Sequence, residues 1–199
     1  MKTLIVVRHA ERPEIKPTEV GNHVLLTEKG KQDTAEFASQ IAGPVVSVKS
    51  SPIGRCLEMA EIIAKVHGYP VDDIEHSRLL GDPGFIIENG KAAWQQWQTK
   101  GHATVNEHLL SASSPMPGFA EFGPAVQSFL QQVRVSLSSA DVGYHVWVTH
   151  DVMLATLASR VMPTPLSISR WPSFLGHLAI TLSDNDELLF RYSQEPFGS

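Results

Sequence analysis

Residues 1–14 read MKTLIVVRHAERPE, and this stretch decides the fold. Its apolar run, Leu4 to Val7, ends abruptly at Arg8, and charged residues continue as far as Glu14. A β-branched run that ends in a charged group is typical of a buried strand whose last residues reach an open edge of a sheet. Ligands of open α/β sheets bind outside the carboxyl ends of the strands. We therefore expect a functional site at the end of this strand.

The charged group after this strand favours an anionic ligand. Arg8 and Arg12 lie on either side of His9. Guanidinium groups match the oxygens of a tetrahedral anion, because their fixed donors bind two oxygens at once. The simplest such ligand is a phosphate.

A second polar group follows the strand expected at residues 45–48. Ser51 as N-cap and Pro52 as the first helical residue predict a helix that ends near residue 68, with Arg55 in its first turn. A helix N-terminus offers unpaired N–H groups and the positive end of the dipole. Arg55 is therefore expected to make a further contact to the anion.

The rest of the chain alternates helical and strand patterns. Helices are expected at residues 27–41, capped by Thr27, and at 124–137 and 152–161, and strands at 144–148, 178–182 and 188–192, with a short strand pattern carried by Val71 and Ile74. Residues 82–123 are irregular and read as a variable insertion too small for a core of its own, usually a lid or a substrate-facing excursion. The strand at 144–148 leads into His150 and Asp151, the third strand to end in polar groups. Alternating strands and helices predict a single α/β domain over residues 1–199, a three-layer αβα sandwich with a mostly parallel central sheet.

Composition excludes several classes of protein. The net charge of -5 argues against nucleic-acid binding, which needs a basic face. The single cysteine, Cys56, lies in an apolar helical pattern and is expected to be a buried thiol rather than part of a disulfide. The apolar run before Arg8 is too short for a signal peptide and far below the ~20 residues of a membrane span. We expect a cytoplasmic protein.

Two further groups of residues receive structural interpretations. Histidines other than His9 and His150 show no metal-ligand spacing, so no metal site is expected, and His177 is expected to lie outside the pocket. Four aromatic residues are candidates for lining a cleft, although core positions are favoured for aromatic side chains in a helical pattern: Phe85, Trp94, Trp97 and Trp171.

Taken together, the motifs resemble the histidine phosphatase superfamily, with its phosphoglycerate mutase-like fold. The resemblance rests on four segments in this order: RHA at residues 8–10, LTEKG at 26–30, SPxxR at 51–55 and a late strand that ends in His150. It covers most of the chain and leaves the insertion as the variable part.

The resemblance implies a mechanism and roles for the site residues. His9 would be the nucleophile and form a phosphohistidine that water hydrolyses. Arg8, Arg12, Arg55 and His150 would bind the phosphoryl oxygens and stabilise their charge. No metal and no cofactor is implied. For its attack, His9 must present a neutral nitrogen, which the surrounding arginines favour.

The sequence departs from the common pattern of this superfamily. Ala10 replaces the usual glycine and narrows the room at that turn. Arg12 and Asp151 resemble the acid phosphatase and phytase branch, in which such an aspartate protonates the leaving group, although Glu14 replaces that branch's usual proline. The short chain and short insertion look more like the mutase branch.

The general acid is accordingly open between two carboxylates. Asp151 is the first choice, because it follows the phosphate-binding histidine and so reaches the leaving oxygen. In the mutase-like interpretation the acid comes from the insertion, where Asp82 and Glu88 lie. Either carboxyl group needs a raised pKa to donate a proton at neutral pH.

The expected function is that of a phosphatase for a small-molecule phosphate ester or a phosphoprotein, with neither nucleic acid nor membrane as a partner. The alternatives are a phosphomutase of the same fold and a catalytically silent protein that binds phosphate or a phosphopeptide. A metal-dependent phosphohydrolase with His150 and Asp151 as ligands would need further histidines at suitable positions, and the sequence does not offer them. The sequence determines neither the oligomeric state nor the substrate.

Overall fold

The fold is built on a central sheet of six strands. The computed structural model describes residues 1–16, 18–111 and 114–197. The strands are β1 (Lys2–Arg8), β2 (Val45–Ser50), β3 (Glu75–His76), β4 (Gly143–Thr149), β5 (His177–Leu182) and β6 (Leu188–Ser193), in the order β3-β2-β4-β1-β5-β6. The first four pair in parallel, whereas β5 is antiparallel to both β1 and β6. The expected mostly parallel sheet and its terminal hairpin are confirmed.

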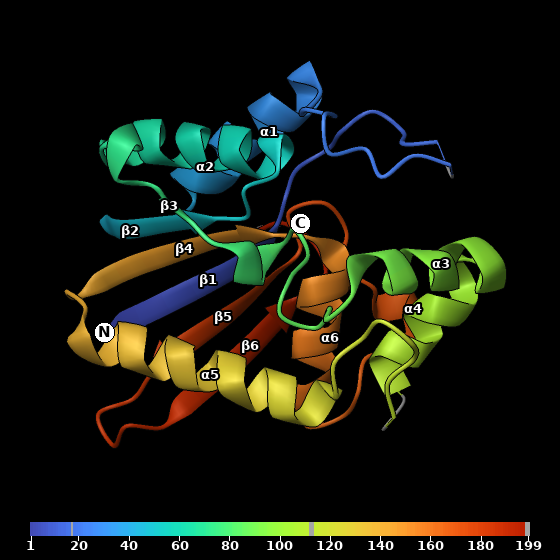
Figure 1. Ribbon diagram of the computed structural model, residues 1–199. Coiled ribbons are helices and arrows are strands. Elements are labelled where there is room, and N and C mark those ends of the chain that lie inside the picture. Colours follow the sequence, from blue (N-terminus) through green and yellow to red (C-terminus); the bar gives the residue numbers. More distant parts are fainter. Residues whose placement is uncertain (17, 112–113, 198–199) are drawn as a thin grey trace.

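Helices cover both faces of this sheet (Figure 1). Helices α1 (Glu28–Ser39) and α2 (Gly54–His67) lie over one face, and α5 (Phe122–Ser139) and α6 (Asp151–Val161) lie on the other side. Successive side chains of β1 point to opposite faces, so Ile5 and Val7 pack with α1 and α2 while Leu4 and Val6 pack with α5 and α6. The three-layer sandwich is confirmed.

The local start signals were correct for α1 but wrong for α2. Thr27 caps α1, because its hydroxyl accepts a hydrogen bond from the Gly30 backbone N–H at 2.9 Å. Helix α2 begins only at Gly54, with Ile53 at its N-cap and no side-chain cap. Ser51 lies before the helix, where its hydroxyl contacts the ring of His150. The hydroxyl also accepts from the Ile53 backbone N–H at 3.3 Å, so it closes a turn before α2 and contacts His150 instead of capping the helix.

The strand expected from Val71 and Ile74 was also wrong. Residues Val71–Asp73 form a 3₁₀ turn, and β3 is only the pair Glu75–His76. Pro70 precedes the turn, and its fixed φ and missing N–H suit the start of a helical turn rather than a strand.

The insertion packs against the end of the sandwich. Its helices α3 (Gly90–Lys100) and α4 (His102–Ser111) lie beside α6 (Figure 1), and α4 contacts α6 directly. Its apolar side chains form a cluster that Phe122 of α5 and Met153 of α6 complete: Ile86, Ala93, Val105, Leu109, Met116 and Phe119. The insertion thus shares its core with two helices of the sandwich, which fixes its position relative to the sheet.

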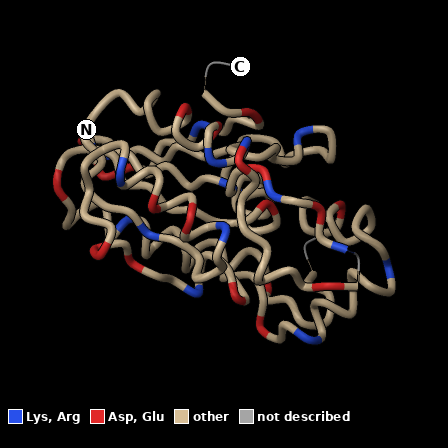
Figure 2. The backbone as a smooth tube through the Cα atoms, turned by 90° about the horizontal axis from the view of Figure 1, so that it is seen from above, with Lys and Arg blue, Asp and Glu red and all other residues tan. Residues whose placement is uncertain are grey.

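Two global features bear on possible partners. Acidic and basic residues are interspersed along the chain (Figure 2). Within the described residues, no helix is long and apolar enough to cross a membrane. The cytoplasmic location expected from the sequence stays a prediction.

Candidate active site

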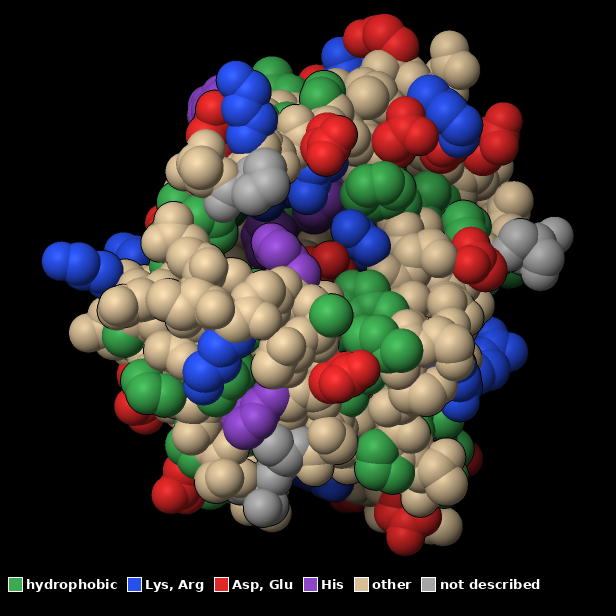
Figure 3. Space-filling model, turned by 90° about the vertical axis from the view of Figure 1, so that its right-hand side faces the viewer, with side chains coloured by type: hydrophobic (Ala, Val, Ile, Leu, Met, Phe, Trp, Pro, Cys, Tyr) green, Lys and Arg blue, Asp and Glu red, His purple; other side chains and the backbone are tan. Residues whose placement is uncertain are grey.

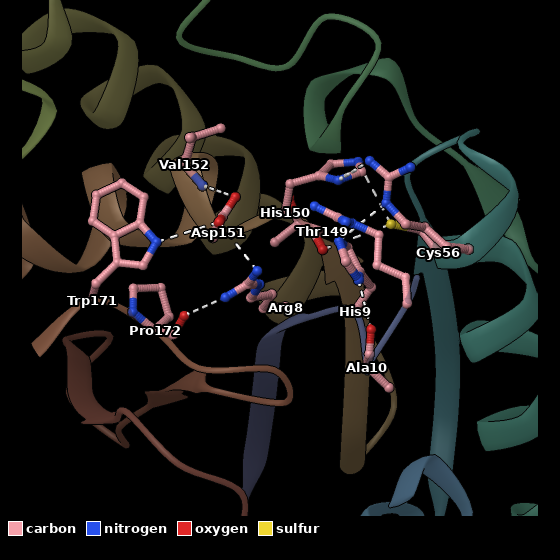
Figure 4. A network of polar contacts seen from close by, with 12 residues as sticks. Arg8, His9, Ala10, Cys56, Thr149, His150, Asp151, Val152, Trp171 and Pro172 are labelled. Carbon is pink, nitrogen blue, oxygen red and sulfur yellow. Dashed lines mark hydrogen bonds and ion pairs between the residues drawn. The ribbon is translucent and has the colours of Figure 1, made fainter. Parts of the chain in front are cut away.

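The residues that follow β1 and β4 leave the sheet side by side. Arg8 pairs with Thr149 in the parallel register, and the His9 backbone N–H donates to the Thr149 carbonyl at 2.9 Å. The loop after β2 brings Arg55, in the first turn of α2, to the same edge. Figure 4 shows the resulting network. The convergence expected from the three strand ends is what the structure contains.

The hydrogen bonds of His9 fix its tautomer. Its Nδ1 lies 2.8 Å from the carbonyl oxygen of Ala10, and its Nε2 lies 3.1 Å from Nε of Arg55. A carbonyl oxygen only accepts and a guanidinium only donates, so the neutral ring carries its proton on Nδ1. The lone pair is therefore on Nε2, on the side of Arg55.

The surroundings of His9 keep this ring neutral. Only 3% of the residue is exposed. Burial lowers the pKa of His9 well below its ordinary value, and His150, Arg55 and Arg8 lower it further. A buried, uncharged imidazole can act as a nitrogen nucleophile at neutral pH once the hydrogen bond from Arg55 leaves its lone pair.

Arg55 and His150 form one hydrogen-bonded unit with the neighbouring loop. Nη1 of Arg55 donates to the Gly21 carbonyl at 2.9 Å, and Nη2 lies 3.4 Å from Nδ1 of His150. On the other side of that ring, Nε2 lies 3.0 Å from the Ser51 hydroxyl. Burial first and then the charge of Arg55 lower the pKa of His150 to about 3. His150 is thus a neutral hydrogen-bonding group held in a fixed orientation.

Arg8 and Asp151 form an ion pair at the other side of the site. Nη2 of Arg8 lies 3.3 Å from Oδ2 of Asp151, and its Nη1 donates to the Pro172 carbonyl at 2.7 Å. Trp171 Nε1 donates to the same Oδ2 at 3.3 Å, and the guanidinium carbon of Arg8 lies 4.4 Å from the ring centre of Phe174. Burial is the largest single effect and raises the pKa of Asp151, but Arg8, His9, the hydrogen bond from Trp171 and His150 together lower it by more, and the net result is a pKa of about 2. In the free protein Asp151 is a carboxylate.

Arg12 and Asp82 lie on the wall of the cavity in front of this network. Arg12 donates from Nη1 to the Pro13 carbonyl at 2.8 Å, while its buried Nε has no hydrogen-bond partner among the described residues. Oδ2 of Asp82 lies 3.8 Å from Nη2 of Arg78, and the Asp82 side chain is half exposed. Glu88 lines a different cavity, beside α5. Of the two insertion carboxylates, the structure brings only Asp82 to the site.

The cavity itself measures about 540 Å³. Figure 3 shows the hollow on this face, with histidine, basic and acidic side chains inside it. Trp94 and Trp97 line it, so the core position favoured for Trp94 was wrong, whereas Trp97 also packs against the apolar cluster of the insertion. Phe85 packs in the core as expected, and Trp171 serves the site through its bond to Asp151. On α3 the small Ala93 takes the core-facing position next to Trp94, which therefore faces the cavity.

Several sequence interpretations of single residues are confirmed. Cys56 is fully buried, and burial raises the pKa of its thiol to about 12. His177 lies away from the cavity, against Phe37 and Phe197. Ala10 is also fully buried and packs in the apolar cluster under α1 and α2. Its methyl group therefore takes no room from the cavity.

Sequence reasoning missed three contributors to the site. The sequence pattern predicts Ser51 as a helix cap and gives no indication of its contact with His150. Gly81 lies so close to His150 that a Cβ atom there would be 2.5 Å from Nε2 of its ring. Phe174, whose ring centre lies 5.8 Å from that of His9, is in a loop with no sequence signal.

In the part of the chain that the structure describes, no group of three or more His, Cys, Asp or Glu side chains is placed to hold a metal ion. His150 and Asp151 accordingly have no further ligands beside them there. Their neighbours are the donors and rings already described.

Comparisons with known proteins agree with this geometry. The family model described as histidine phosphatase superfamily (branch 1) matches residues 4–187. No curated protein sequence matches the chain significantly. Several solved structures have a similar fold over nearly the whole of each chain, among them the following three.

The first is a mycobacterial glucosyl-3-phosphoglycerate phosphatase, with 14% identity, a TM-score of 0.62 and 96% of both chains covered. The second is the phosphoserine phosphatase of Entamoeba histolytica, solved with 3-phosphoglyceric acid, with 16% identity, a TM-score of 0.65 and 96% of both chains covered. The third is YhfR of Bacillus stearothermophilus, with 23% identity, a TM-score of 0.63 and 98% of both chains covered. At these identities the likeness concerns the fold.

Proposed function

The chain belongs to the histidine phosphatase superfamily, branch 1, and on this premise we propose that it is a metal-independent phosphatase that hydrolyses phosphomonoesters through a phosphohistidine intermediate. The observation that carries the proposal is the state of His9. Its ring is neutral and buried, and its lone pair is on Nε2 at the carboxyl edge of the sheet. Phosphatases among the proteins of similar fold support the same reaction class.

The phosphoryl group binds between the basic residues. Arg8, Arg12 and Arg55 donate to its oxygens, and the buried Nε atoms of Arg8 and Arg12, unpaired among the described residues, gain acceptors. Once Arg55 turns to the phosphate, His150 donates from Nδ1 in the tautomer whose Nε2 accepts from the Ser51 hydroxyl. Buried donors without partners are costly, so an anion that satisfies them is bound favourably. When a phosphoryl oxygen takes the Nε–H of Arg55, the lone pair of His9 is released for attack.

In the first step, Nε2 of His9 attacks phosphorus and the bond from phosphorus to the ester oxygen breaks. The alcohol leaves with a proton from the general acid. The Ala10 carbonyl keeps its hydrogen bond from Nδ1 and stabilises the positive charge of the phosphorylated ring. In the second step, water attacks phosphorus, the P–N bond breaks, and the same carboxylate takes the proton of the water.

Asp151 is our first choice for the general acid, with Asp82 as the alternative. The low pKa of Asp151 belongs to the free protein, in which Arg8 faces it. A bound phosphate dianion engages Arg8 and adds negative charge beside the carboxylate, and both effects raise its pKa toward the range of an acid. Asp82 lines the same cavity without a buried arginine partner among the described residues.

The proposed partner is a small phosphate ester, which fits the size of the cavity, or a phosphorylated side chain of a protein that enters it. A phosphomutase and a silent phosphate-binding protein are the alternatives. The buried methyl group of Ala10 removes one reason to expect a silent protein, because it leaves the cavity open.

Hydrolysis of p-nitrophenyl phosphate tests the proposal. His9→Ala is expected to abolish turnover and to remove the acid-labile phosphoenzyme that rapid quenching traps in the wild-type chain. His76→Ala, the same change at an exposed histidine of β3, is the matched control and is expected to retain full activity. Turnover that survives in His9→Ala overturns the proposal, and a phosphoenzyme that passes its phosphate to a second sugar or acid rather than to water identifies a mutase.

A further inference from the structure

The insertion presents one face of each of its helices to the cavity. The lining residues of α3 include Lys91, Trp94 and Trp97, spaced three apart, besides Gly90 at its start, and those of α4 are His102 and Asn106, spaced four apart. Residues at these spacings share one side of a helix. Two helices of the insertion thus form one wall of the cavity, and loop residues such as Val20 and Asn22 complete its lining.

This wall combines two indole rings with one amide. The ring of Trp97 is held by Phe119, with 5.2 Å between ring centres, whereas Trp94 is half-buried at the cavity surface. Asn106 lines the same cavity, and its buried Oδ1 has no hydrogen-bond partner among the described residues. A buried carbonyl oxygen left without a donor carries a penalty, so it marks a position where a ligand donates.

The chemistry of the wall matches a flat, polar ring system. Indole rings stack on planar aromatic groups, and a side-chain amide pairs with the donor and acceptor on the edge of a nucleobase. A cavity of about 540 Å³ is within the range of small-molecule sites.

We infer that the phosphate ester taken by this cavity is a nucleoside monophosphate, with its phosphate at His9, its base against Trp94 and the edge of the base at Asn106. The inference rests on the proposed function for the position of the phosphate. The apolar residues Ile87 and Met153, which also line the cavity, would contact the nucleoside.

Affinity measurements on two compounds separate the contribution of the base to binding from that of the phosphate. Adenosine 5′-monophosphate and ribose 5-phosphate share the phosphate and the sugar and differ in the base. Calorimetric titration of the full-length His9→Ala chain avoids turnover. We expect the nucleotide to bind at least about tenfold more tightly, as expected for stacking of one base.

Variants of α3 and α4 locate the base. Trp94→Ala is expected to remove the preference for the nucleotide while leaving the affinity for ribose 5-phosphate within about twofold, and Trp94→Phe is expected to keep most of the preference. Asn106→Ala is expected to weaken only the nucleotide, by roughly 3- to 10-fold. Gln98→Ala, at an exposed position of α3, is the matched control and is expected to change neither affinity.

Equal affinities for the two compounds, or a preference that survives in Trp94→Ala, overturn the inference. Hydrolysis by the wild-type chain is measured in parallel. If the base-dependent binding is found but neither compound is hydrolysed, the proposed function fails and the inference stands. If His9-dependent hydrolysis is found without any effect of the base, the proposed function stands and the inference fails.

Discussion

Arg55 donates from Nε to Nε2 of His9 across 3.1 Å, on the face from which that ring must attack. The same guanidinium donates to the Gly21 carbonyl and reaches Nδ1 of His150. One side chain therefore fixes the tautomer of the nucleophile, ties the loop after β1 to the site, and orients a second phosphate donor.

Replacing Arg55 with lysine is expected to be severe although the charge is kept. An ammonium group on a flexible chain cannot donate in the three directions of the guanidinium fork. We expect kcat for p-nitrophenyl phosphate to fall about 10²- to 10³-fold, which is typical for loss of a preorganised donor to the reacting group. Steady-state kinetics measure this effect, and wild-type kcat in the Arg55→Lys variant would show that the charge alone suffices.

Substrates with different leaving groups identify the proton donor, because only some leaving groups need a proton. An alkyl phosphate needs its leaving oxygen protonated, whereas p-nitrophenolate leaves readily without a proton. If Asp151 is the acid, Asp151→Asn lowers kcat about 10²- to 10⁴-fold on an alkyl phosphate and far less on p-nitrophenyl phosphate.

Asp82→Asn is the matched comparison, because it makes the same change on another part of the cavity wall. It is expected to leave the ratio of the two substrates unchanged. The reverse pattern, with the ratio altered only by Asp82→Asn, assigns the proton to the insertion. An equal loss on both substrates in Asp151→Asn would mean that this carboxylate serves only to position Arg8.

The sequence was sufficient to predict every strand of the sheet except β3, and the convergence of Arg8, Arg55 and His150. Burial patterns and strand ends are local signals, and parallel strands necessarily end at one edge. Ser51 shows where local signals fail. A Ser-Pro pair before a helical pattern predicts a helix cap, and this pattern contains no information about a distant residue that can also bind the serine hydroxyl. The competing partner, His150, is 99 residues away in the chain.

The insertion was the least predictable region for a related reason. Trp94 and Trp97 have the spacing of a buried helix face, and only the packing of Ala93 and the neighbouring helices shows that they face a cavity. The sequence does not identify the proton donor, because the pKa of Asp151 depends on burial and on the distance to Arg8. A sequence motif specifies neither of these.

Gly81 provides a steric test of the position of His150. A Cβ at this residue would lie 2.5 Å from Nε2 of His150, and also against the Ser51 hydroxyl, so one of these groups must move. We expect Gly81→Ala to lower kcat/KM by roughly 10- to 100-fold through displacement of the ring, with the fold retained. Gly123→Ala, where a Cβ meets no atom within 4 Å, is the control. Unchanged kinetics in Gly81→Ala would contradict the close packing.

The neutral histidines of the site also predict how stability depends on pH. In the unfolded chain a histidine takes up a proton below about pH 6.5, whereas the pKa of His150 in the folded protein is about 3 and that of His9 is also lowered. Between these values the unfolded state binds more protons, so the free energy of unfolding falls as the pH falls. For His150 alone the loss from pH 6.5 to pH 5 is up to about 2 kcal/mol.

Asp151 affects the stability of the fold in a different pH range. Its lowered pKa stabilises the fold above about pH 4 and this contribution is lost only as the pH falls toward 2, so it adds nothing to the change between about pH 7.5 and 5. Urea unfolding of the wild-type chain and of His150→Gln at these two pH values isolates the histidine. We expect the wild-type free energy of unfolding to fall more than that of the variant, by up to about 2 kcal/mol. Identical losses in the two chains would mean that the ring of His150 accepts a proton in the folded state, and a charged ring could then no longer accept the hydrogen bond that Arg55 offers to its Nδ1.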